Sequence, residues 1–199
     1  MSKINLENIM DKELRIQTTG RDDYKEDEYH HPYEPTPYTV LERLAESEYI
    51  TRDNILVDYG CGKGRVDFYL SAQIGCQTIG IDFDERMIKK ALENNRDFVG
   101  KRKPEFLSIS AENYEITDTD CFYFFNPFSI EILRSVLGKI LESYYENPRS
   151  MTLFFYYPDE EYVAYLMTKE ELMFVDEIDC MDLFEGENDR ERILIFEIG

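Results

Sequence analysis

Three evenly spaced glycines are the residues of this 199-residue sequence best placed to do chemistry. Gly60, Gly62 and Gly64 follow a short apolar run that ends at Asp58. Glycine lets the backbone turn sharply and lets a ligand approach it closely. A helix that begins after such a loop presents unpaired N–H groups and the positive end of its dipole. Because parallel sheets bind ligands at the carboxyl ends of their strands, the loop is predicted to hold a small molecule.

The spacing of the glycines excludes two common nucleotide sites. A phosphate-binding loop needs Ser or Thr after its lysine, whereas Lys63 is followed by Gly64. A dinucleotide-binding loop needs Gly-x-Gly-x-x-Gly, and Arg65 stands at the position of its third glycine. The carboxylate of Asp58 would also repel a pyrophosphate, although it would suit an ammonium group.

Asp82 ends a second apolar run, as Asp58 ends the first. A carboxylate at that place can accept hydrogen bonds from both hydroxyls of a ribose, and Phe83 beside it can pack against a base. The other role open to Asp82 is to cap the next helix, but Asp84 already fills that role. Asp82 is therefore predicted to bind ribose.

Arg65 begins the predicted helix, where its charge opposes the helix dipole. It is expected either to pair with a carboxylate such as Asp67 or Glu85, or to reach a carboxylate on a ligand. We favour the structural pairing.

The elements that position these residues follow from hydrophobic periodicity. Short apolar runs without alternation are typical of parallel strands buried on both faces. Their alternation with helices predicts an α/β fold, and the close spacing of the last two strands predicts an antiparallel pair at one edge. Residues 1–36 are polar and are predicted to be an N-terminal extension or a substrate lid before a domain at 37–199. Strands are expected at 55–58, 78–82, 105–109, 120–125, 152–157, 173–184 and 192–198, and helices at 37–49, 66–72, 84–95, 130–141 and 160–167.

Composition limits the classes of partner. Asp and Glu number 42 against 22 Lys and Arg, for a net charge of −20, so a bulk nucleic-acid substrate is disfavoured. No apolar run reaches the roughly 20 residues of a membrane-spanning helix, and no signal peptide is recognisable; a cytoplasmic protein is expected. The cysteines form no C-x-x-C pair and the histidines are adjacent, so we expect reduced, mostly buried thiols and no metal site.

The motifs resemble those of class I S-adenosylmethionine-dependent methyltransferases. Residues 57–65 are similar to motif I of that family and residues 79–84 to its motif II. Ser110-Ala111-Glu112 stands where motif III places its adenine contacts, although the family more often has Asp at the first position. The resemblance covers residues 37–199 and implies a three-layer Rossmann-like fold, with a seven-stranded, mostly parallel sheet and an antiparallel edge.

The same resemblance implies S-adenosylmethionine as the cofactor and a place for each part of it. Asp58 and the glycine loop would hold the methionine part, Asp82 the ribose, and the motif III residues the adenine side. The cofactor-binding residues predicted in this way are Asp58, Gly60, Cys61, Gly62, Gly64, Asp82, Phe83, Ala111, Glu112 and Asn126.

Asn126-Pro127-Phe128, after the fourth predicted strand, is the candidate catalytic segment. It resembles the Asn-Pro-Pro-Tyr or Asn-Pro-Pro-Phe motif of methyltransferases that modify amino groups of adenine, cytosine or glutamine. In those enzymes the Asn and a backbone carbonyl bind a planar amine, and the ring stacks on it. Phe128 replaces the second proline, so the sequence departs from that pattern. The alternative is a turn in which Pro127 starts the next helix.

Methyl transfer from a sulfonium is an in-line displacement that needs alignment more than covalent help. The predicted core offers no histidine as a base, because His30 and His31 lie in the N-terminal segment with Tyr33 and Tyr38. Residues 17–38 are hypothesised to fold over the cofactor and supply the acceptor site, with the Thr36-Pro37-Tyr38 turn beside the methionine end and Tyr38 as a further candidate catalytic residue; otherwise they only cover the sheet. The predicted function is methyl transfer to a protein side chain or a small molecule. The alternatives are a methyltransferase for nucleic-acid base amines and a cofactor-binding module without turnover.

Overall fold

Strands and helices alternate along the chain, as the periodicity predicts. The computed structural model describes residues 3–21 and 33–199. The strands are β1 (Ile55–Tyr59), β2 (Gln77–Asp82), β3 (Glu105–Ser108), β4 (Cys121–Phe124), β5 (Met151–Tyr156), β6 (Met173–Asp179) and β7 (Arg192–Ile198). The helices are α1 (Lys3–Leu14), α2 (Tyr38–Glu46), α3 (Arg65–Gln73), α4 (Glu85–Asp97), α5 (Ile130–Glu146) and α6 (Glu160–Leu166), with short 3-10 helices η1 (Ala111–Asn113) and η2 (Met181–Leu183).

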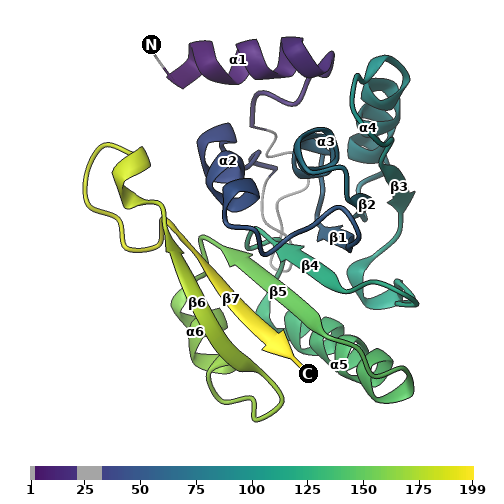
Figure 1. Cartoon of the computed structure of the whole chain (residues 1–199), viewed down its shortest axis with the longest axis vertical. Helices are drawn as coiled ribbons and strands as arrows, with labels where there is room; N and C mark the ends of the chain where they lie inside the picture. Colours follow the sequence, from purple (N-terminus) through teal and green to yellow (C-terminus); the bar gives the residue numbers. More distant parts are fainter. Residues whose placement is uncertain (1–2, 22–32) are drawn as a thin grey trace.

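The seven strands form one sheet in the order β3-β2-β1-β4-β5-β7-β6 (Figure 1). All pairs from β3 to β5 are parallel, whereas β7 runs antiparallel to both β5 and β6. The predicted sheet with its antiparallel pair at one edge is therefore confirmed. From β1 the chain first builds outward through β2 and β3 and then returns to place β4 on the other side. This switch point leaves a crevice at the carboxyl ends of β1 and β4.

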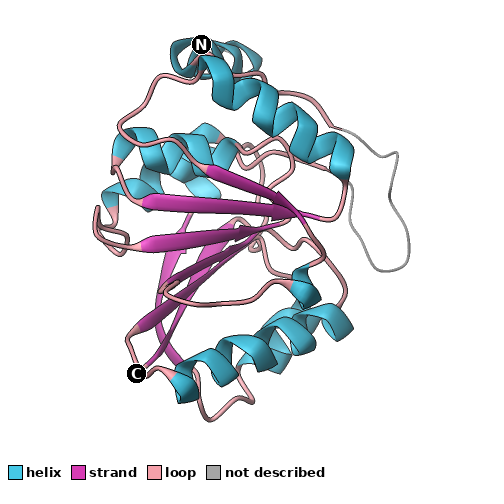
Figure 2. Cartoon of the chain, turned by 90° about the vertical axis from the view of Figure 1, so that its right-hand side faces the viewer, coloured by secondary structure: helices cyan, strands magenta, loops and turns pink. Residues whose placement is uncertain are grey.

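Helices cover both faces of the sheet (Figure 2). Helices α2, α3 and α4 pack on one face, and α5 and α6 pack on the other. Successive strand residues serve opposite faces: Leu56 belongs to the first core and Val57 to the second. The absence of alternation in β1 follows from this, because an apolar core lies on each side. The three-layer fold is confirmed.

Helix α1 was not predicted from the sequence. It packs outside the three layers, against α2 and α3. Its inward face buries Asp11 as well as Leu14, so the sequence lacks the apolar stripe that would predict a helix here. The buried carboxylate accepts hydrogen bonds from Thr18 (2.6 Å) and from Tyr38 (2.5 Å). Polar contacts to distant residues hold α1 in place.

The predicted strand at 173–184 is too long. Strand β6 ends at Asp179, whose side chain accepts a hydrogen bond from the backbone N–H of Met181 (2.8 Å) and so turns the chain into η2. The four cysteines are free and buried, as expected. Within the described residues, no helix is both long and apolar enough to span a bilayer.

Candidate functional site

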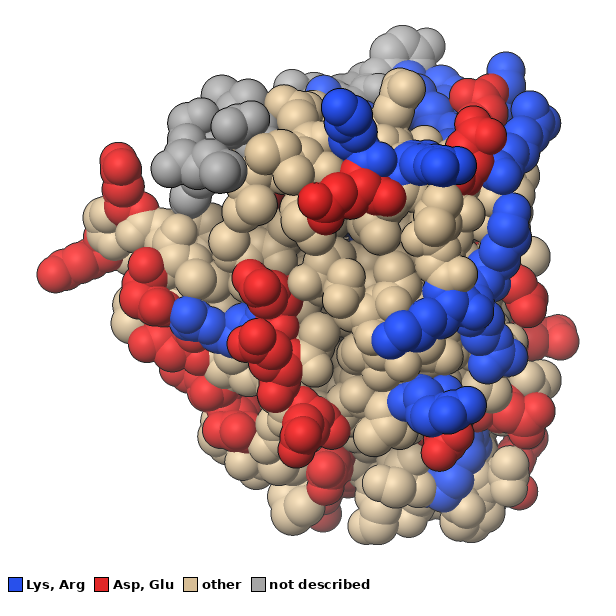
Figure 3. Space-filling model, turned by 45° about the horizontal axis from the view of Figure 1, so that its top comes forward, with Lys and Arg blue, Asp and Glu red and all other residues tan. Residues whose placement is uncertain are grey.

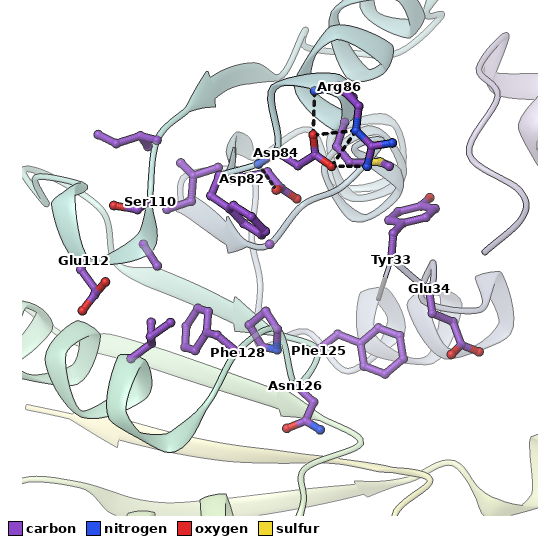
Figure 4. Close-up of a pocket in the computed structure, with 18 residues that line it drawn as sticks. Tyr33, Glu34, Asp82, Asp84, Arg86, Ser110, Glu112, Phe125, Asn126 and Phe128 are labelled. Carbon is purple, nitrogen blue, oxygen red and sulfur yellow. Dashed lines mark hydrogen bonds and ion pairs between the residues drawn. The ribbon is translucent and has the colours of Figure 1, made fainter. Parts of the chain in front are cut away.

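A cavity opens at the carboxyl edge of the sheet, beside the ends of β1, β2 and β4. It holds about 900 Å³ of space including its open mouth, which is the scale of a small-molecule site. Figure 4 shows Ser110 and Glu112 at one end, Tyr33 and Glu34 at the other, and Asp82 between them. Eight of the predicted cofactor-binding and catalytic residues line it: Gly60, Asp82, Phe83, Ala111, Glu112, Asn126, Pro127 and Phe128.

Asp82 joins the glycine loop to the cavity wall. One of its carboxylate oxygens accepts a hydrogen bond from the N–H of Gly62 (2.9 Å), and the other accepts from the N–H of Asp84 (2.8 Å). A carboxylate has about four acceptor positions, so these bonds are compatible with further bonds from ribose hydroxyls. The first predicted strand end and the second thus meet at one place, as a nucleoside site requires.

The glycines of the loop are required by the protein's own packing. Gly60, Gly62 and Gly64 have φ values of 78°, 55° and 84°, in the left-handed region that side chains disfavour. A Cβ at Gly62 would lie 2.2 Å from the ring carbons of Tyr33, and one at Gly60 would lie 2.7 Å from Cβ of Pro127. Gly62 and Gly64 do not line the cavity. The sequence alone assigned this space to a ligand, whereas a side chain of the N-terminal segment occupies it above Gly62.

Tyr33 ties the N-terminal segment to the glycine loop. Its hydroxyl donates to the carbonyl of Thr18 (2.6 Å), and the Nζ of Lys63 lies 4.5 Å from the centre of its ring. Lys63 also donates to the carbonyl of Thr19 (3.2 Å). Sequence reasoning placed Tyr33 in a lid segment without giving it a contact. His30 and His31 lie outside the described residues.

Asp58 lies beneath the loop and outside the cavity, together with Cys61. It is buried against Asp67, and both carboxyls are inaccessible to solvent. Burial raises the pKa of Asp58 to about 7. Burial, and then the neighbouring charge of Asp58, raise the pKa of Asp67 well above its ordinary value. Two carboxyls at such close quarters do not both ionise at neutral pH, so the pair holds a proton.

Arg65 forms the expected structural ion pair, but with other partners. Asp67 and Glu85 do not contribute; the guanidinium pairs with Glu7 and lies 3.9 Å from Asp11, both on α1. Only 2% of the Arg65 side chain is exposed. A buried cation needs such partners, because an unpaired charge in the interior is strongly destabilising.

Tyr38 belongs to this same buried network. Its hydroxyl donates to Asp11, and the guanidinium of Arg65 lies 4.4 Å from the centre of its ring. It does not line the cavity, so the structure gives no support to placing Tyr38 beside the methionine end. It supports the protein's interior instead.

Asn126-Pro127-Phe128 closes the cavity on the β4 side. Pro127 does not start the next helix, since α5 begins at Ile130. The ring of Phe128 packs edge-on against Tyr59, with ring centres 6.4 Å apart, and its carbonyl accepts a hydrogen bond from Tyr162 (2.6 Å). Pro127 of the same segment lies directly beside Gly60, so the segment packs against the glycine loop.

Comparison with known proteins gives matches to methyltransferases. Residues 56–146 match the family described as "Methyltransferase domain". A protein-lysine N-methyltransferase of Saccharolobus islandicus (strain REY15A) is 33% identical over 66 residues, which are 33% of this chain and 41% of that relative. The chain therefore matches less than half of the length of this curated relative.

Two solved structures share the fold at low sequence identity. An rRNA methylase from Streptococcus thermophilus has a TM-score of 0.55 and 16% identity, covering 83% of this chain and 96% of that one. An RNA methyltransferase from Salinibacter ruber, in complex with S-adenosyl-L-homocysteine, has a TM-score of 0.57 and 21% identity, covering 83% and 94%. Residues 56–146 thus match a methyltransferase domain, and the fold is shared with known methyltransferases. The predicted fold is confirmed, and the predicted class I S-adenosylmethionine-dependent family and its cofactor agree with these matches.

The walls of the cavity fit this family's cofactor. Phe83, Met87, Ile109 and Phe128 give apolar surface for a flat base. The Asp82 carboxylate lies on the same wall, where ribose hydroxyls would need acceptors. The apolar wall and the Asp82 carboxylate thus have the chemistry that the base and the ribose of S-adenosylmethionine would need.

Proposed function

We propose that this chain transfers a methyl group from S-adenosylmethionine to a protein side chain or a small molecule, and that it does so in the described cavity. One observation carries the proposal. The glycine loop, the Asp82 carboxylate and Asn126-Pro127-Phe128 come from different parts of the chain, and they meet around one cavity at the switch point of the sheet.

We assign the parts of the cofactor by the chemistry of the walls. Asp82 accepts the ribose hydroxyls, and Phe83, Ala111 and Glu112 lie on the adenine side. Gly60 offers backbone to the methionine part, next to Asn126. Asp58, Cys61, Gly62 and Gly64 do not line the cavity, so we assign them the role of supporting the loop.

The bound cofactor supplies an electrophilic methyl group. The protein's part is to align the acceptor and to exclude water, which the closed wall of Tyr33, Pro127 and Phe128 supports. A protein side chain is favoured by the name of the Saccharolobus relative and by the acidic surface. We also propose that the end of the N-terminal segment helps to close the site, because Tyr33 and Glu34 line the cavity.

A base amine of RNA is the second candidate, and a local basic surface favours it. In the view of Figure 3, basic side chains are most numerous on the right, with some acidic ones among them, and acidic side chains predominate on the left. Exposed cations lie along α4 and the turn that follows it, at Lys89, Lys90, Arg96, Lys101, Arg102 and Lys103. The net charge of −20 opposes long-range attraction of a phosphate backbone, so this remains the lesser candidate.

Two measurements test the proposed function. Calorimetry with S-adenosylhomocysteine should show binding to the wild-type chain. Label from methyl-tritiated S-adenosylmethionine should then appear in the protein or small-molecule fraction of a cell extract. Label in RNA alone would establish the second candidate, and binding without any transfer would establish a non-catalytic module. Absence of binding would refute the proposal.

A further inference from the structure

A second hollow adjoins the cofactor cavity at its Tyr33–Glu34 end. We call it the aromatic hollow; its walls include Phe125, Tyr156 and Tyr157 with Glu34, Asn126 and Glu191. Three of these residues, Glu34, Phe125 and Asn126, line the cofactor cavity as well. In Figure 4 the ring of Phe125 extends toward Glu34, and the amide of Asn126 points away from Asp82. A ligand in this hollow would therefore meet the edge of the cofactor cavity without entering it.

Two residues that line the aromatic hollow have strained backbone conformations. Asn126 has a φ of 42° and Tyr157 a φ of 52°, a region that residues other than glycine seldom adopt. They follow the adjacent strands β4 and β5. Tyr157 is fixed by a bond from its N–H to the carbonyl of Arg192 (3.0 Å). Such strain persists only where the surrounding structure imposes it, and it collects at functional sites.

The amide of Asn126 lacks a partner on its oxygen. This atom is buried and accepts no hydrogen bond from the part of the chain that the structure describes. A buried acceptor without a donor is costly, so native proteins rarely keep one without a reason. An N–H group of a bound molecule would satisfy it.

The aromatic rings and carboxylates give the hollow the chemistry of a cation site. The ring centre of Phe125 lies 4.6 Å from that of Tyr156 and 6.3 Å from that of Tyr157. The hydroxyl of Tyr156 donates to Glu191 (2.7 Å), which holds this carboxylate at the wall. Aromatic faces and carboxylates both attract an alkylammonium group. The same carboxylates would repel a phosphate.

Two arginines also line the aromatic hollow, and both are engaged. Arg21 lies 3.8 Å from the carboxylate of Glu34. Arg190 lies over the ring of Tyr157, 4.2 Å from its centre, and donates to the carbonyl of Tyr157 (3.1 Å). Arg190 thus shows that this aromatic wall accepts a cation on at least one ring face.

We propose that the aromatic hollow is the acceptor site and that it takes a primary alkylammonium, either a lysine side chain of a protein or a free alkyl diamine. The proposal rests on the proposed methyltransferase function. The ammonium first loses a proton to solvent at the exposed Glu34 rim. The nitrogen lone pair then bonds to the methyl carbon as the carbon–sulfur bond breaks, and sulfur keeps that electron pair. The products are a methylammonium and the thioether form of the cofactor.

The test uses the full chain, methyl-tritiated S-adenosylmethionine and four acceptors. These are a lysine-containing peptide, the same peptide with arginine at every lysine, 1,5-diaminopentane, and transcribed RNA. Label is expected on the lysine peptide or the diamine, and the choice between them identifies the source of the amine. Label on the arginine peptide or on RNA in place of the amines would overturn the proposal.

Glu191→Gln tests the site itself. Glutamine keeps an oxygen that can accept the bond from Tyr156, so only the charge is lost. The KM for the amine should rise about tenfold, as expected for one lost contact to a charged group, with kcat and S-adenosylhomocysteine affinity nearly unchanged. Glu187→Gln is the matched control, since it makes the same change at an exposed residue of the preceding loop.

The outcomes distinguish failure of the proposed methyltransferase function from failure of the proposed acceptor site. If the wild-type chain fails to bind S-adenosylhomocysteine, the proposed function fails. If it binds S-adenosylhomocysteine but methylates neither amine, only the acceptor proposal fails. An unchanged KM in Glu191→Gln, or the same change in Glu187→Gln, would remove the aromatic hollow from the acceptor site.

Discussion

Asp67→Asn should make the folded chain more stable at neutral pH, by an amount that grows with pH. The carboxyl of Asp67 is fully buried, and burial together with the charge of Asp58 raises its pKa well above 3.8. The protonated form is therefore favoured in the folded chain relative to the unfolded chain. Asparagine resembles the protonated form and has no proton to lose when the chain unfolds.

The size of the effect follows from proton linkage. Because the folded-state pKa is raised, the stability that this carboxyl contributes is greatest below pH 3.8 and falls as the pH rises toward its folded-state pKa. One proton difference changes the free energy of unfolding by about 1.4 kcal/mol per pH unit. This loss begins above pH 3.8, and the variant avoids it. An unsatisfied amide N–H in the variant would cost about 1–3 kcal/mol at every pH, so the slope is the decisive quantity.

Urea unfolding followed by circular dichroism at pH 5, 6 and 7 measures this slope. The difference between variant and wild type should rise with pH, by up to about 1.4 kcal/mol for each pH unit while the folded carboxyl keeps its proton and the unfolded one has lost it. Asp53→Asn, the same change at a side chain that is 93% exposed, serves as the control and should show no such rise. Parallel pH profiles for Asp67→Asn and wild type would mean that Asp67 is ionised in the folded chain, and the shared proton would have to be abandoned.

Three further predictions follow from the same contacts. Gly62→Ala should destabilise the chain by about 1–3 kcal/mol, because the new Cβ meets the ring of Tyr33; adding Tyr33→Ala should recover part of the loss in a double-mutant cycle, and full additivity would contradict the contact. Arg65→Gln should cost about 3–5 kcal/mol in urea unfolding, since it strands the buried carboxylates of α1, and a loss below 1 kcal/mol would show that α1 is not held by this pair. Asp82→Ala should weaken S-adenosylhomocysteine binding by about 1–3 kcal/mol in calorimetry; unchanged affinity would remove Asp82 from the ribose site.

Local patterns in the sequence were sufficient for the sheet and for the wall of the cavity. Strand ends at Asp58 and Asp82 follow from apolar runs that stop at an acid, and the turn after β1 follows from glycines that only a left-handed backbone needs. These signals are local, because burial and turn geometry act on neighbouring residues. They predicted that Gly60 and Asp82 lie at one edge of the sheet, whereas Ala111 was assigned there by the resemblance to motif III.

Long-range contacts decided what local patterns could not. Helix α1 has no apolar stripe, since it is held by Glu7 and Asp11 against an arginine about fifty residues or more further along the chain. Hydrophobic periodicity also does not predict that the ring of Tyr33 packs against Gly62.

The sequence by itself thus determined the order of the elements and the polar ends of the strands, and it carried the resemblance to the methyltransferase family. The tertiary structure alone decided that Asp58 shares its burial with Asp67, that Tyr38 serves the interior, and that the ends of β4 and β5 enclose an aromatic hollow. The physical reason is that charge pairing, proton sharing and ring packing depend on which distant side chains the fold brings within a few ångströms, and sequence spacing carries no record of that.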